Sequence, residues 1–178
     1  STFGFGGSTT SLIHGKKPSA TSGVRREQVL TDNIAGPRGD FWKSELTAIL
    51  SSAESYAEWD LGKPTPVRAA YLQGDDNDVY SISGSEDGQT FTVLWQAGPV
   101  GGGGLQPRYV DNLQATARYI RVSATGGDGS YGLAEVQVFS EVPDTWPPKP
   151  TVRDSIPPDE VLRNKILALG LALAVAVV

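Results

Sequence analysis

Short runs of alternating apolar and polar residues recur along the middle of this sequence, and turn-forming residues separate them. Residues 56–61, 79–83, 90–95 and 117–122 all alternate in this way. Side chains of a strand point to opposite faces in turn, so this period predicts strands with one buried face, and Trp59 is expected in the core. Because the runs are spaced by roughly ten residues without a long helical period between them, they predict an antiparallel β-sandwich or barrel.

Composition agrees with an all-β fold and excludes several kinds of site. The 21 glycines and 12 prolines suit short strands joined by many turns. The net charge of −5 and the pI of about 4.8 argue against a nucleic-acid partner, because phosphate binding needs a basic surface. The chain contains no cysteine, which excludes disulfides and thiolate metal sites.

Four segments of different composition divide the chain. Residues 1–23 are rich in Gly, Ser and Thr and are expected to form an extended, flexible arm. Residues 24–141 hold the predicted sandwich, and residues 142–157 form a Pro-rich, semi-rigid linker. Residues 158–178 are predicted to begin a transmembrane helix.

The tail predicts a membrane anchor because no polar side chain follows Lys165. A helix that is apolar on all sides is typical of a membrane span, which needs about 20 such residues. A buried helix of a soluble protein is the alternative. The residues expected in the bilayer are Ile166, Leu167, Leu169, Leu171, Leu173, Val175, Val177 and Val178.

The predicted strands and turns resemble the discoidin domain, also called the coagulation-factor type C domain, of the galactose-binding-like superfamily. The resemblance rests on residues 29–33 followed by Trp42, on 57–62, on 83–88 followed by Phe91, and on 117–122 with 133–138, and it covers about two-thirds of the chain. It implies an antiparallel jelly-roll β-sandwich. Many members bind glycans or phospholipid headgroups through loops at one end, and the missing flanking cysteines point to a bacterial version.

Calcium is the one ion that the resemblance implies, as a structural ion rather than a required cofactor. Asp32 with nearby carbonyls, and Glu135 on the last strand, are the candidate ligands, because Ca²⁺ takes six to eight oxygen ligands. In the alternative interpretation, Asp32 caps a turn and Glu135 pairs with an arginine. Arg118 and Arg121 are expected to form structural ion pairs within the sandwich.

Two further groups of residues have candidate roles. Trp42, Trp95, Tyr109 and Tyr131 could stack on sugar rings where they are exposed, although core packing explains each equally well. The acidic cluster at 75–78 lacks the spacing of an EF-hand loop and is expected to be a solvated turn.

The sequence offers no catalytic constellation. The only histidine, His14, lies in the expected arm, so a Ser-His-Asp triad within the sandwich is excluded. The glycines at 101–104 are not followed by Lys-Ser/Thr and a helix, so they form no phosphate loop.

The main prediction is therefore a non-catalytic, membrane-anchored binding domain on the periplasmic or other extracytoplasmic side. Its expected partners are the subunits of a bacterial membrane complex, in which it would be an accessory or stabilising subunit, and the lipid bilayer. The first alternative is a carbohydrate-binding module at the cell envelope, with a glycan as partner. The second is the exported N-terminal part of a polytopic membrane enzyme such as a glycosyltransferase. The absence of methionine, even at position 1, is interpreted as removal of an export signal or trimming of the sequence.

Overall fold

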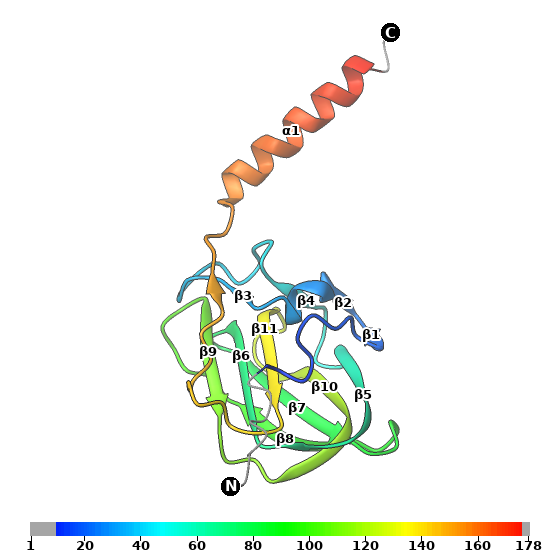
Figure 1. Cartoon of the computed structure of the whole chain (residues 1–178). Coiled ribbons are helices and arrows are strands. Elements are labelled where there is room, and N and C mark those ends of the chain that lie inside the picture. The colour runs from blue at the N-terminus through cyan, green and yellow to red at the C-terminus, as the bar shows by residue number, and fades with distance from the viewer. Residues whose placement is uncertain (1–9, 176–178) are drawn as a thin grey trace, which may run out of the picture.

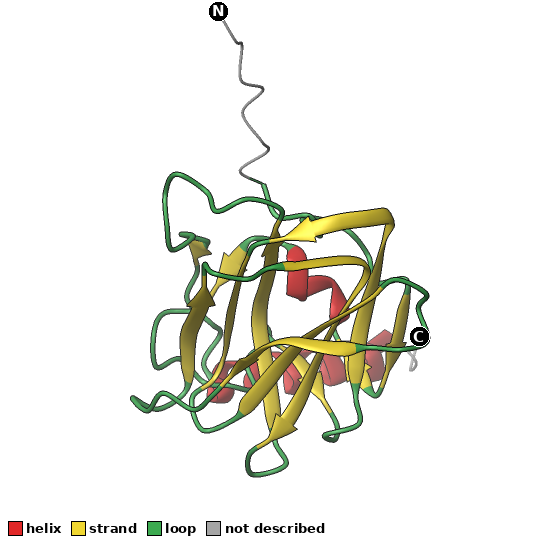
Figure 2. Ribbon diagram, turned by 90° about the horizontal axis from the view of Figure 1, so that it is seen from below, coloured by secondary structure: helices red, strands yellow, loops and turns green. Residues whose placement is uncertain are grey.

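The computed structural model describes the backbone of residues 10–175 and the side chains of residues 10–172. Two antiparallel sheets of five strands pack face to face, and one helix projects from the C-terminal end of the chain (Figures 1 and 2). The predicted all-β sandwich is thus confirmed.

The strand order shows how the chain alternates between the two sheets. The first sheet has the order β1 (Ala20–Ser22), β5 (Tyr56–Val67), β10 (Ala115–Gly126), β7 (Val79–Ser85) and β8 (Thr92–Ala97). The second has the order β2 (Val24–Arg25), β4 (Ala48–Leu50), β11 (Tyr131–Phe139), β6 (Ala69–Asp75) and β9 (Leu105–Val110). The remaining elements are the 3-10 helix η1 (Glu27–Thr31), the parallel pair β3 (Ile34–Ala35) and β12 (Thr151–Val152), and helix α1 (Pro158–Val175).

The core lies between the sheets, where the alternating residues of the long strands meet. Trp59 is buried as predicted and pairs with Ile120 across β5 and β10. Its indole N–H donates to the carbonyl of Lys16 at 3.0 Å, so the polar edge of the ring is satisfied inside the core. Packing and hydrogen bonding together fix this side chain.

A β-bulge in β11 changes which residues face the core. Simple alternation places Leu133 and Glu135 on one face, but the pairing with β6 shifts between these two residues. Leu133 therefore joins Val136 and Val138 in the core, whereas Glu135 turns toward the loop at Asn33. The bulge keeps the Glu135 carboxylate, although it is buried, out of the apolar cluster between the sheets.

The prediction of a flexible N-terminal arm is wrong for residues 10–22. Ile13 is fully buried in the core, and its neighbour Leu12 donates its backbone N–H to the carbonyl of Val138 at 2.7 Å. Strand β1 pairs with β5, so this segment extends the first sheet. Residues 1–9 of the predicted arm lie outside the described residues.

The Pro-rich segment is bound to the sandwich rather than free of it. The ring of Trp146 makes edge-on contacts with Phe139 and Tyr109, with centroids 5.8 and 6.1 Å apart. Further along, β12 pairs with β3. The segment therefore runs back along the sandwich and delivers α1 to the end of the molecule where β3 and β4 lie (Figure 1).

The predicted membrane anchor lies on α1. Within the described residues, no helix combines the length and apolarity needed to cross a bilayer. Ile166, Leu167, Leu169 and Leu171 are exposed. The side chains of Leu173 and Val175, and the whole of Val177 and Val178, lie outside the described part, and the membrane span stays a prediction.

Strand β9 was not expected from the sequence, because Pro107 interrupts its apolar pattern. A proline has no N–H for a sheet ladder, but β9 lies at the edge of its sheet, where one side needs no partner. Pro107 pairs with Gln73 of β6 in this position.

Candidate functional site

Four loops meet at the end of the sandwich from which α1 emerges. The loop before β4 is joined to the start of β9 by a bond from the N–H of Leu105 to the carbonyl of Asp40 at 2.9 Å. The β6–β7 turn bonds in the same way to Gly104, again at 2.9 Å, and Asn77 donates to Asp128 in the loop before β11. These bonds join the four loops into one surface, which we call the loop end.

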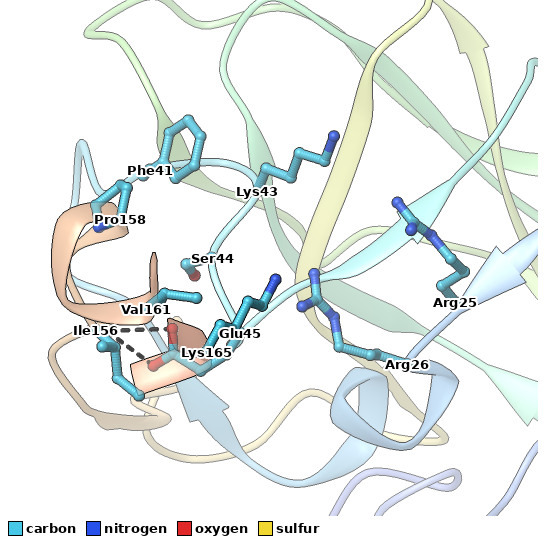
Figure 3. A pocket seen from close by; sticks show the side chains of 10 residues that line it. All are labelled: Arg25, Arg26, Phe41, Lys43, Ser44, Glu45, Ile156, Pro158, Val161 and Lys165. Carbon is cyan, nitrogen blue, oxygen red and sulfur yellow. Dashed lines mark hydrogen bonds between the residues drawn. The ribbon is translucent and has the colours of Figure 1, made fainter. Parts of the chain in front are cut away.

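A cavity of about 390 Å³ opens between this loop end and the base of α1 (Figure 3). Its sandwich side is formed by β2, its junction with η1 and the loop before β4, and its other side by the first turns of α1. The lining residues are Arg25, Arg26, Phe41, Lys43, Ser44, Glu45, Ile156, Pro158, Val161 and Lys165. We call it the basic pocket.

The basic pocket brings four cationic side chains around a single carboxylate, that of Glu45. Arg26 is fixed by a hydrogen bond from its Nε to the carbonyl of Thr47 at 2.9 Å. Burial and the neighbouring charge of Arg25 lower the pKa of Arg26, and Glu45 opposes this effect. The pocket therefore holds an excess of positive charge within an acidic chain.

Aromatic and polar groups complete the basic pocket. Phe41 is 46% exposed, and its ring lies 6.0 Å from that of Trp42 at an angle of 58°. The ammonium group of Lys43 lies 5.8 Å from the centre of the Trp42 ring. An exposed aromatic face beside charged donors can stack on a flat ligand and hydrogen-bond to its substituents.

Asp32 and Glu135, the predicted calcium ligands, are brought together across η1 and β11. Glu135 is buried and accepts hydrogen bonds from the backbone N–H of Asn33 at 2.9 Å and from the Gln137 amide at 3.3 Å. Burial, and to a lesser extent the charge of Asp32, raise the pKa of Glu135 to about 9, because a carboxylate in this position lacks compensating charge. Asp32 caps a turn by accepting from Ile34, as the alternative interpretation expected, whereas Glu135 bonds to Asn33 and Gln137 rather than to the arginine of that interpretation.

This donor set agrees with calcium in kind but supplies only part of its ligands. Asp32, Glu135 and Asn33 carry side-chain oxygens in one place, whereas Ca²⁺ takes six to eight oxygens. In residues 10–175, no group of three or more His, Cys, Asp or Glu side chains has the arrangement of a metal centre. An ion here would need backbone carbonyls and water as its other ligands.

The four aromatic candidates differ in accessibility. Tyr131 is buried, so it is not available for a ligand, whereas Trp42 and Trp95 are half-buried. Tyr109 is 48% exposed but lies beside Trp146 on the linker side of the sandwich, away from the basic pocket. Phe41, which the sequence did not single out, is the exposed ring that lines the basic pocket, whereas Tyr109 lines a separate cavity with the Pro-rich segment.

The acidic cluster at 75–78 is not the solvated turn that was expected. Asp75 and Asp78 are buried, and Tyr80 donates its hydroxyl to Asp78 at 2.9 Å. Arg108 of β9 reaches the same place and donates to the carbonyl of Asp75 at 2.7 Å. The cluster is a structural polar network, and it was missed because β9, which carries the arginine, was not predicted.

The predicted ion pairs of the first sheet are confirmed. Arg118 contacts Asp60 at 2.9 Å and Arg121 contacts Glu58 at 2.8 Å. The basic pocket, by contrast, was not found from the sequence. Its only visible signal was the Arg25-Arg26 pair and the run 41–43 in an otherwise acidic chain.

Comparisons with known proteins agree with this fold. The family model described as F5/8 type C domain matches residues 17–136. No curated protein sequence matches the chain. A fucose binding module from Streptococcus pneumoniae superposes with a TM-score of 0.54 at 20% identity, over 79% of this chain and 100% of that one. A mutant of the lectin binding domain of Lectinolysin, complexed with Lewis b, gives 0.54 at 16% identity, over 75% and 97%. At these identities the likeness concerns the fold.

Proposed function

The chain belongs to the F5/8 type C domain family, and from that premise we propose that it is a non-catalytic glycan-binding module whose site is the basic pocket. The observation that carries the proposal is the exposed ring of Phe41 beside charged donors in a cavity at the loop end. Sugar rings present C–H faces that pack on an aromatic ring and hydroxyls that need hydrogen-bond partners.

The structural neighbours support a glycan more than any other partner. The Streptococcus pneumoniae module binds fucose and the Lectinolysin domain carries Lewis b, and both share the sandwich architecture of this chain. The comparisons give no support to an accessory subunit of a membrane complex. Glycan binding therefore takes precedence over that prediction.

A glycan array followed by calorimetry on the full chain tests the proposal. Phe41→Ala should weaken binding about tenfold or more, because it removes the stacking surface without opening the core. Tyr109→Ala is the matched control, since Tyr109 has nearly the same exposed fraction but lies outside the basic pocket. If only the Tyr109 variant lost binding, the glycan site would instead lie on the linker side of the sandwich.

We also propose that a structural calcium ion binds at Asp32 and Glu135. The support is the raised pKa of a buried carboxyl group beside a second one, a pair that a divalent cation would neutralise. Such an ion would fix η1 against β11 and thereby the loop that leads to the basic pocket.

A further inference from the structure

The charge of the basic pocket is opposite to that of the whole chain. Four of the 15 Lys and Arg residues line one cavity, against one of the 20 acidic residues. The overall net charge of −5 does not explain why four cationic side chains lie around one cavity. Like charges held together cost free energy unless a ligand or partner supplies the opposite charge.

We propose that the basic pocket selects acidic glycans, which carry a carboxylate or sulfate group, over neutral ones. This inference rests on the proposed glycan-binding function and names the class of sugar. Arg25, Arg26 and Lys43 would approach the anionic group from the sandwich, and Lys165 from α1. The ring of Phe41 would pack on the sugar to which that group is attached.

The pocket is prepared for an anion before any ligand arrives. Arg26 uses Nε to bond to the carbonyl of Thr47, which orients the guanidinium group and leaves its terminal nitrogens for a ligand. Burial, and after it the charge of Arg25, lower the pKa of Arg26, and a bound anion would oppose both effects by favouring the charged guanidinium group. A guanidinium group held in this way suits the paired oxygens of a carboxylate or sulfate.

The single carboxylate of the pocket does not cancel these cations. Both oxygens of Glu45 accept the backbone N–H of Ile156, at 3.0 and 3.1 Å (Figure 3). Next to it, the Ser155 hydroxyl donates to Asp40 at 2.8 Å. Glu45 thus holds the base of α1 in place, and this position brings Lys165 to the pocket.

Calorimetry with matched pairs of sugars tests the selectivity. The full chain is titrated with trigalacturonate and with neutral trigalactose, and with keratan sulfate and its desulfated, neutral form. One acidic ligand should bind at least about tenfold more tightly than its neutral partner, and added NaCl should weaken the acidic ligand selectively.

Charge variants show whether the basic pocket is responsible. The double change Arg25→Gln with Lys43→Gln should abolish the preference for the acidic ligand. The double change Lys17→Gln with Lys63→Gln removes the same charge at exposed positions outside the pocket and should leave the preference intact. Circular dichroism and thermal melting confirm that each variant is folded.

The possible failures are distinguishable. Equal affinity for neutral and acidic sugars, lost with Phe41→Ala, would overturn the inference and leave the proposed function standing. The absence of binding to any glycan would overturn both. Binding to phosphatidylserine vesicles without binding to any sugar would also overturn both, and would assign the cations to a lipid headgroup.

Discussion

Both carboxylate oxygens of Glu45 accept the backbone N–H of Ile156, so a loop of the sandwich is joined directly to the segment that begins α1. This contact links residues 111 positions apart in the chain. It fixes one wall of the basic pocket, which would otherwise depend on the path of a Pro-rich segment.

Removing this contact should loosen the base of α1. We expect Glu45→Ala to increase hydrogen–deuterium exchange at the amide of Ile156 and its neighbours, because that N–H would lose its acceptor. The bond is exposed, so the free energy of unfolding should change by less than about 1.5 kcal/mol. Glu54→Ala, at another exposed loop position, is the control. Unchanged exchange at Ile156 in the Glu45 variant would contradict the role of the contact.

The two arginines of β10 should differ in their contribution to stability. The guanidinium carbon of Arg121 lies 3.8 and 3.9 Å from the ring centres of Tyr56 and Phe91, and its partner Glu58 is only 11% exposed. We expect Arg121→Ala to lower the free energy of unfolding by about 1–3 kcal/mol, since Glu58 would be left unpaired. Arg118→Ala, in a more exposed pair, should cost no more than about 1 kcal/mol. Urea denaturation measures both, and equal losses would refute the distinction.

The buried carboxyl group of Asp78 should give the protein a defined pH dependence. Burial raises its pKa from 3.8 to about 6, so between these values the folded state binds more protons than the unfolded chain. The free energy of unfolding contributed by this group therefore falls as the pH rises from about 4 to about 6, and is constant above that. Asp78→Asn should flatten the curve over this interval in urea denaturation. A parallel curve for the variant would show that Asp78 does not titrate there.

Gly132 should tolerate no larger side chain, because its Cα faces the carbonyl oxygen of Trp42. A Cβ added there would collide with backbone, and we expect Gly132→Ala to cost about 1–3 kcal/mol. It should also weaken glycan binding, since Trp42 is the neighbour of Phe41. The matched change Gly126→Ala meets only Val79 Cγ2 at 3.4 Å and should be nearly neutral. Thermal melting compares the two, and equal shifts would contradict the packing argument.

Calcium should stabilise the wild-type protein and not a variant that lacks one of its carboxylates. We expect CaCl2 to raise the melting temperature, because an ion bound only by the folded state shifts the equilibrium toward it. Glu135→Gln should remove this response while retaining the shape of the side chain. An equal shift in wild type and variant, or the same shift with MgCl2, would count against the proposed site.

Much of the sandwich could be predicted because its strands carry local signals. The alternation around Trp59 and the hairpin between β7 and β8 follow from side-chain periodicity and turn chemistry. These local signals failed to predict the structure where a contact with a distant segment of the chain determines it. Ile13 sits in a Gly/Ser-rich stretch with no periodicity, and Pro107 breaks a strand pattern that an edge position tolerates.

The sequence alone determined the fold class and the family resemblance, because these depend on residue types at fixed local spacings. It also indicated that Arg118 and Arg121 are ion-paired, but their partners Asp60 and Glu58 lie 58 and 63 positions away and only the structure identified them. Only the tertiary structure decided the direction of Glu135 and the place of the basic pocket. A one-residue bulge turned Glu135 away from the core. The docking of the Pro-rich segment on β3 brought Lys165 to Arg25 and Lys43. Neither event has a local signature, since each results from pairing between segments far apart in the chain.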